Sequence, residues 1–146
     1  MFEAIYTAIQ TVNANEDIQL QNSIKCPKHR VLLREGSGII TLKGPSSCCP
    51  CNQFFRYQVT LNGNMAVPTT GTLGPINVAI MLNGGEIQSS IAENTPTVVD
   101  AYGNFSVTAA IDVPNGCCGT ISFRNISASG TAINTKNVNV VINQKN

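Results

Sequence analysis

The side chains of this sequence that are most able to do chemistry are its six cysteines and its single histidine. Two residues separate Cys26 from His29, and two separate Cys48 from Cys51, so these four side chains could together bind a tetrahedral zinc ion. The cysteines could instead form disulfides, within the domain or between subunits, or remain free thiols that pack as small apolar groups. The disulfide or cross-link candidates are Cys26, Cys48, Cys49, Cys51, Cys117 and Cys118. The spacing leaves these alternatives open, and zinc is the one cofactor that it suggests.

Little else in the sequence could build a catalytic site. A cysteine nucleophile would need His29 as its base, and the residues around Cys26 and Cys48 resemble no nucleophile motif. The acidic residues are scattered and mostly flank turns, where carboxylates are simply solvated. The phrase Gly36-Ser37-Gly38 lies between expected strands, whereas a phosphate-binding glycine loop leads into a helix. We therefore expect a protein that is not an enzyme.

Charge and hydropathy exclude several classes of partner. Charged residues make up 12% of the chain and the net charge is +1, which provides no attractive field for nucleic acid. No stretch of apolar residues is long enough to span a membrane. The N-terminal residues MFEAIYTAIQTV contain an acid and no basic residue, so they do not form a signal peptide. The sequence therefore predicts a protein made in the cytoplasm, with no nucleic-acid or membrane partner.

The elements that must position these groups are short β-strands separated by turn residues. Apolar and polar residues alternate in residues 54–61 (FFRYQVTL) and 105–113 (FSVTAAIDV), which predicts half-buried strands. Residues 76–82 (INVAIML) are nearly all apolar, as in a strand buried on both faces or at a subunit interface. Turn signals such as Asn62-Gly63 and Pro114-Asn115-Gly116 separate the runs. Further strands are expected at residues 18–24, 30–33, 38–42, 86–91, 97–101, 120–126 and 132–142. Strands at this spacing predict a β-sandwich or barrel.

The N-terminal residues allow two interpretations. Phe2, Ile5, Tyr6 and Ile9 have the spacing of one face of a helix. Ile5, Thr7, Ile9 and Thr11 would alternate equally well in a strand. The sequence contains no linker and no repeat, so we expect residues 16–146 to form one domain. Residues 1–15 are expected to act as an N-terminal arm that docks to a larger assembly.

Residues 54–126 also resemble a known family. The phrases Leu82-Asn83-Gly84 and Ile121-Ser122-Phe123-Arg124-Asn125, with the final alternating residues 138–142, are similar to the C-terminal domains of bacterial collagen-like and exosporium proteins. The whole chain is similar to small proteins of Firmicutes and their phages, several of which are virion components. The resemblance implies an antiparallel jelly-roll β-sandwich like that of tumour necrosis factor and C1q, and a homotrimer. The sequence departs from the family in having no collagen stalk before the domain.

Three functional hypotheses follow from these observations. The first is a structural virion protein, a trimer that decorates or stabilises a capsid or forms part of a head fibre and is attached through residues 1–15. The second is a binding module for a glycan or receptor, with its site in the loops at residues 62–74 and 93–102. The third is a fibre subunit of a cell or spore surface that is cross-linked through cysteines. The absence of tryptophan argues against an aromatic sugar-binding platform.

Overall fold

We describe residues 1–24, 30–46, 53–127 and 130–145 of a computed structural model. These residues contain eleven strands and no helix, and the alternative of an N-terminal helix is therefore wrong. It follows that no helix in the described part of the chain could cross a membrane. The strands are β1 (Phe2–Tyr6), β2 (Gln10–Val12), β3 (Gln21–Ile24), β4 (Val31–Arg34), β5 (Ile39–Lys43), β6 (Phe54–Ala66), β7 (Ile76–Leu82), β8 (Gly85–Asn94), β9 (Gly103–Pro114), β10 (Cys118–Asn125) and β11 (Ile133–Gln144).

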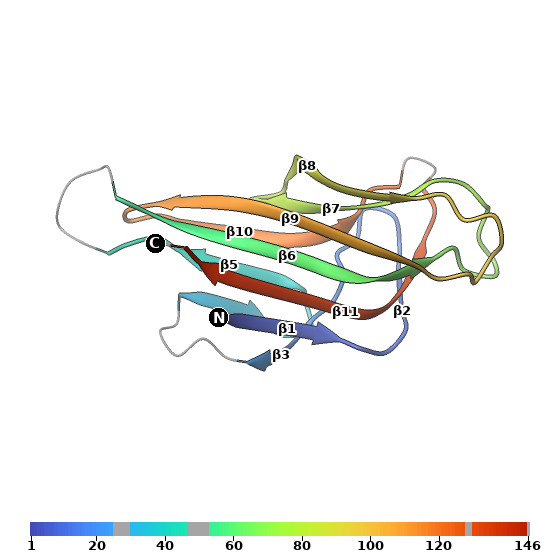
Figure 1. Cartoon of the computed structure of the whole chain (residues 1–146), viewed down its shortest axis with the longest axis horizontal. Coiled ribbons are helices and arrows are strands. Elements are labelled where there is room, and N and C mark those ends of the chain that lie inside the picture. The colour runs from blue at the N-terminus through green and yellow to red at the C-terminus, as the bar shows by residue number, and fades with distance from the viewer. Residues whose placement is uncertain (25–29, 47–52, 128–129, 146) are drawn as a thin grey trace.

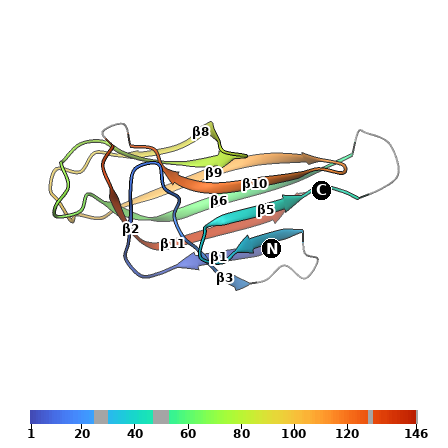
Figure 2. The same ribbon diagram turned by 180° about the vertical axis from the view of Figure 1, so that it is seen from behind.

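The strands form two antiparallel sheets packed face to face (Figure 1). The six-stranded sheet has the order β3-β1-β11-β6-β9, and β2 pairs with one end of β11. The five-stranded sheet has the order β4-β5-β10-β7-β8. The reverse view shows β5 and β10 in front of the long β6 and β11 (Figure 2). The strands β6, β9 and β11 run the length of the sandwich and give it an elongated shape.

The strand connections identify the topology. Of the eight main strands, β1, β6, β9 and β11 lie in one sheet, whereas β5, β7, β8 and β10 lie in the other. The chain crosses between the sheets at every connection from β5 to β11 except the hairpin between β7 and β8. Eight strands wound in this way form a jelly roll. The predicted all-β antiparallel jelly-roll sandwich is therefore confirmed.

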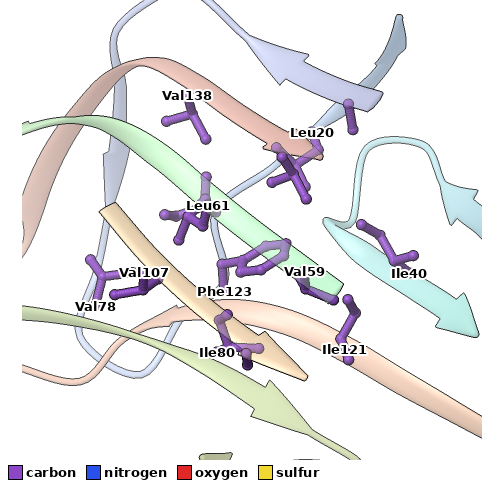
Figure 3. Packing of buried hydrophobic residues seen from close by; sticks show 14 of the residues in the cluster. Leu20, Ile40, Val59, Leu61, Val78, Ile80, Val107, Ile121, Phe123 and Val138 are labelled. Carbon is purple, nitrogen blue, oxygen red and sulfur yellow. The ribbon is translucent and has the colours of Figure 1, made fainter. Parts of the chain in front are cut away.

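Alternating side chains from both sheets fill the space between them. Along β9 every second residue from Phe105 to Val113 is buried, as the sequence pattern predicts. Phe123 of β10 is completely buried and lies close to Val59 and Leu61 of β6 (Figure 3). The continuous apolar pattern of β7 is also confirmed, since Val78 and Ile80 point into this core while Ala79 and Met81 are buried on the opposite face.

The N-terminal residues belong to the sandwich. The strand β1 pairs with β11 and places Phe2 opposite Ile142, while Phe2, Ala4 and Val12 are buried in the core. Docking by residues 1–15 stays a prediction, but this segment cannot be removed without also removing a core strand. A deletion would therefore test folding as much as attachment.

Two sequence expectations about turns and strands are wrong. Asn62-Gly63 does not turn the chain, because β6 continues through it to Ala66 and pairs with β9 as far as Met65. A Cβ atom on Gly63 would lie 3.0 Å from the Phe105 ring, so glycine here leaves room for that ring. Residues 97–101 form no strand but part of the loop between β8 and β9, where Asp100 has a left-handed φ of 60°.

Candidate functional site

An open concavity lies on the outer face of the six-stranded sheet. It is an open hollow of about 500 Å³ lined by Asn62, Gly63, Asn64, Asn104, Phe105, Ser106 and Asn137. We call it the amide hollow. Side chains alternate between the two faces of a strand, so the even-numbered residues of β6 and β9 point away from the core here. The pairs Asn62–Ser106 and Asn64–Asn104 face each other across the two strands.

An irregularity in β11 brings the fifth polar side chain to the hollow. Lys136 pairs with Asn64 and Asn139 pairs with Asn62, so two residues of β11 lie opposite the single residue Gly63. This is a β-bulge, which bends the strand and redirects its side chains. Asn137 takes a left-handed φ of 53° there, while the next residue, Val138, stays buried. Asparagine adopts this conformation more readily than most residues.

The polar groups of the hollow are largely unused within the protein. The Ser106 hydroxyl donates to Asn62 Oδ1 over 2.7 Å. Among the described residues, no side-chain hydrogen bond is made by Asn64, Asn104 or Asn137. Each of these amides can both donate and accept hydrogen bonds. The hollow therefore presents several donors and acceptors whose partner is solvent.

No ionisable side chain lines the hollow. The nearest cation along β11, Lys136, places its Nζ 4.1 Å from the centre of the Tyr102 ring. Burial raises the pKa of the Tyr102 phenol, and the charge of Asp100 raises it further. The phenol thus stays neutral at physiological pH. The hollow itself is lined by amides and a hydroxyl, which do not titrate near neutrality. Such a site is suited to a neutral ligand rich in hydroxyl groups.

An ion pair marks the opposite end of the same face. Arg56 Nε donates to Asp112 Oδ1 over 2.7 Å, and Nη2 donates to Oδ2 over 2.8 Å. The hydrogen bond from Arg56 lowers the pKa of Asp112 below its ordinary value, and the same bond raises the pKa of Arg56. A lowered acid pKa adds stability that is lost as the pH falls through it. Because both side chains are exposed, this contribution is small.

The predicted metal and disulfide residues are only partly placed. Cys26, His29, Cys48, Cys49 and Cys51 lie outside the described residues, so the zinc and disulfide alternatives stay predictions. Within the described ranges, no group of three or more His, Cys, Asp or Glu side chains could hold a metal ion. Cys117 is an exposed free thiol in the connection between β9 and β10, and Cys118 is an exposed free thiol at the first residue of β10.

Backbone hydrogen bonds join the β9–β10 connection to residues on both sides of residues 47–52. Gly44 N donates to Cys117 O over 3.0 Å and Gly116 N donates to Pro45 O over 2.9 Å. On the other flank, Asn115 N donates to Gln53 O over 2.9 Å. Gly44, Pro45 and Gln53 therefore all lie beside the β9–β10 connection.

We expect both exposed thiols to react with a maleimide in the folded, reduced protein nearly as fast as in denaturant, since neither is shielded. Intact-mass analysis of the protein and of the Cys117→Ser/Cys118→Ser variant would count the adducts. A zinc-dependent protection of either thiol that a chelator reverses would contradict this expectation and assign that cysteine to a metal site.

Sequence reasoning found part of the amide hollow. The predicted binding loop at residues 62–74 contains Asn62 and Asn64, but its first five residues belong to β6 and not to a loop. Asn104 and Ser106 were not predicted from the sequence as site residues. Their polar side chains alternate with the buried residues of β9, and this pattern could have placed them on the outer face. Asn137 had no such signal, because a bulge cannot be located from alternation alone.

No protein-family model matches the chain, and no curated protein matches it. Among solved structures, the globular domain of the zebrafish complement 1qA protein is 6% identical, with 96% of this chain and 94% of that chain covered and a TM-score of 0.49. A family 35 carbohydrate binding module from Clostridium thermocellum is 18% identical, with 94% and 96% covered and a TM-score of 0.41. The C-terminal domain of EclA, a sugar-binding protein, is 14% identical, with 94% and 79% covered and a TM-score of 0.40. No phage or exosporium family is identified, and the jelly-roll assignment rests on the strand order of this chain.

Proposed function

We propose that this protein is a non-catalytic binding module that recognises a neutral, hydroxyl-rich ligand, such as an uncharged glycan, in the amide hollow. The observation that carries the proposal is the lining of that hollow by four asparagines and a serine with no charged group. Amide groups donate to one sugar hydroxyl and accept from the next, as glycan hydroxyls require. Phe105 is buried, so recognition would depend on hydrogen bonds and not on stacking of a sugar on an aromatic ring.

The test is binding of neutral oligosaccharides by wild-type protein and by the Asn64→Ala/Asn104→Ala variant. An array of cello-, xylo-, manno- and galacto-oligosaccharides would select the probe, and calorimetry would measure its affinity. We expect the variant to bind about tenfold or more weakly, because each lost hydrogen bond is worth about 1 kcal/mol. We also expect the wild-type affinity to change little between about pH 5 and pH 8, since neutral amides do not titrate.

Thr108→Ala provides the matched control. Thr108 is exposed on the same face of β9 but does not line the hollow, and its hydroxyl lies 3.4 Å from that of Thr60. This variant is expected to bind the probe as the wild type does. The proposal would be abandoned if no neutral oligosaccharide bound, or if the double asparagine variant bound as tightly as the control.

A second candidate function is a structural subunit of a particle surface, in the form of the predicted virion-decorating trimer. The observation in its favour is the uncharged centre of the six-stranded face, where Thr60 lies between Val141 and Thr108 in one cross-strand row. Repeated copies could pack through such a face without repulsion between like charges. Native mass spectrometry would test it: a trimer supports this candidate, and a chain that stays monomeric at high concentration opposes it.

A further inference from the structure

The outer face of the five-stranded sheet, on the other side of the molecule from the amide hollow, carries apolar side chains on neighbouring strands. Met81 and Ala79 of β7 are buried there by their neighbours, and Ile39 of β5 is half-buried. At the sides of the face, Leu32 of β4 is 38% exposed and Ile91 of β8 is 40% exposed. Large apolar side chains that gather on one surface commonly mark an interaction site.

A bulge in β8 sets which of its side chains face outward. The register between β7 and β8 shifts between Ala79 and Met81, and the Ser90 side chain turns inward at this point. Ile80 N donates to the Ser90 hydroxyl over 3.1 Å, and that hydroxyl donates to Ile87 O over 2.7 Å. The side chain thus replaces the missing ladder contacts and leaves Ile91 on the outer face, opposite Ala79.

One cross-strand row of this face has opposite charges at its two ends. Arg34 pairs with Ile39, and Met81 pairs with both Ser122 and Glu86. The pair Ile40–Ile121 places Ile39 beside Ser122 and completes the row. From β4 to β8 the row reads Arg34, Ile39, Ser122, Met81 and Glu86. We call it the polar-ended row.

The two charged ends have no partner of opposite sign within the described part of the molecule. The ion pairs found there are Arg56–Asp112 and Arg124–Asp17. Arg34 and Glu86 are both exposed and stand four strands apart, which is about 19 Å at the usual strand spacing. That separation exceeds the Debye length of about 8 Å at physiological ionic strength, so they do not stabilise each other in one chain.

We propose that this face is the interface of a two-fold symmetric pair, with a second copy of the chain as its partner. In this pair the two five-stranded faces lie against each other, and the two-fold axis runs between them, parallel to the strands. The axis reverses the strand order, so β4 of one copy lies over β8 of the other. It leaves each cross-strand row at the same height along the strands. The axis would place Arg34 over the Glu86 of the second copy, and Glu86 over the second copy's Arg34. Ile39 would then lie over the Met81 of the second copy, and the central Ser122 over the second copy's Ser122, as an isologous interface requires.

The other charges on this face lie off the polar-ended row. Lys43 of β5 pairs with Cys118 and Glu93 of β8 pairs with Asn77, so these two charges lie near opposite ends of the strands and do not meet across the axis. Arg124 of β10 is already paired with Asp17 over 3.1 Å. A parallel stacking without this reversal would place like charges over each other. Complementary charge thus fixes the orientation, while burial of the parts of Leu32, Ile39 and Ile91 that are exposed in one copy supplies the attraction.

The expected strength follows from the size of the face. Five strands spaced about 4.8 Å apart, each contributing about six residues, present a face roughly 20 Å on a side. Two such faces bury about 800 Å², which is below the range of stable interfaces and typical of weak, transient ones. We therefore expect a concentration-dependent association and not a permanent dimer. It is independent of the amide hollow, so its loss should leave binding of a neutral oligosaccharide unchanged.

The test uses charge reversal and sedimentation velocity over a range of protein concentrations. As the concentration rises, we expect wild-type protein to form a dimer with twice the mass of the monomeric Arg34→Glu variant. Arg34→Glu and Glu86→Arg should each associate at least tenfold more weakly, because each places two like-charge pairs in the interface. The doubly reversed variant should associate within about threefold of the wild type.

A mixture of the two single variants gives the sharpest result. One copy then has acids at both ends of the row and the other has bases at both ends, so the mixed pair should form although neither variant pairs with itself. Asp112→Asn, on the opposite face, is the control and should associate as the wild type does. The proposal is overturned if wild-type protein never doubles in mass, if both single variants associate normally, or if the mixture fails to associate.

Discussion

Replacing Gly44 with alanine is expected to lower the free energy of unfolding by at least about 3 kcal/mol, because the added methyl group has no room. A Cβ atom at this position would lie 2.0 Å from Pro114 O and 3.0 Å from Val113 O. Both are backbone atoms of β9, so no side-chain rotation relieves the clash. The strand end would have to move, and the hydrogen bond from Gly44 N to Cys117 O would be strained.

Thermal denaturation would measure this effect against two matched glycine variants. We expect Gly44→Ala to lower the melting temperature by roughly 10 °C. Gly74→Ala should be nearly neutral, since a Cβ there meets nothing within 4 Å and the backbone is not left-handed. Gly84→Ala has the same open space but a φ of +82°, so it should cost about 1 kcal/mol. If Gly44→Ala had the same melting temperature as Gly74→Ala, the close approach of Gly44 to the end of β9 would be disproved.

Replacing Asn125 with alanine is expected to destabilise the protein by about 3 kcal/mol, because its side chain is fully buried and every polar atom of the amide is used. Nδ2 donates to Val12 O over 3.0 Å and to Thr131 O over 2.9 Å. Oδ1 accepts from Ser127 N over 3.1 Å and from the Ser127 hydroxyl over 2.6 Å. The Ser127 hydroxyl in turn accepts from Asn77 N over 3.0 Å, so one amide connects the ends of four strands.

Urea denaturation of three variants would separate hydrogen bonding from volume. Asn104→Ala, on the exposed face of β9, should change the free energy of unfolding by less than about 0.5 kcal/mol. Asn125→Asp keeps the shape but replaces the donating amide with an acceptor that faces two carbonyl oxygens. The pKa of that carboxyl would be raised in the folded state, so this variant should regain stability as the pH falls. A variant Asn125→Ala as stable as Asn104→Ala would contradict the role of the network.

The fold was predictable from the sequence where one periodicity acts over many residues. The alternation in β9 predicted which residues are buried, and the apolar run of β7 predicted burial on both faces. The prediction failed at Asn62-Gly63, where a strong local turn signal was outweighed by pairing on both sides of β6. Local preference is worth about 1 kcal/mol, and a strand with partners on both edges gains more than that.

The amide hollow could be predicted only in part for a related reason. Its residues on β6 and β9 follow from strand parity once β6 is known to continue past Asn62. The position of Asn137 depends on the extra residue in β11 opposite Gly63, and the sequence of one strand does not specify the register of another. Pairing between distant strands, which determines both the hollow and the polar-ended row, is the information that a single sequence does not provide.

The pairing of the first strand with the last determines when this protein can fold. The centre of the six-stranded sheet is β11, which lies between β1 and β6 and follows all the other described strands in sequence order. The hairpin of β7 and β8 can form from local contacts, but β1 must wait for nearly the whole chain before it finds its partner. Folds dominated by such non-local contacts fold in milliseconds to seconds, far more slowly than helical bundles. During that time the unpaired edges of β1 and β6 are exposed, and the few charges of this chain offer little protection against aggregation.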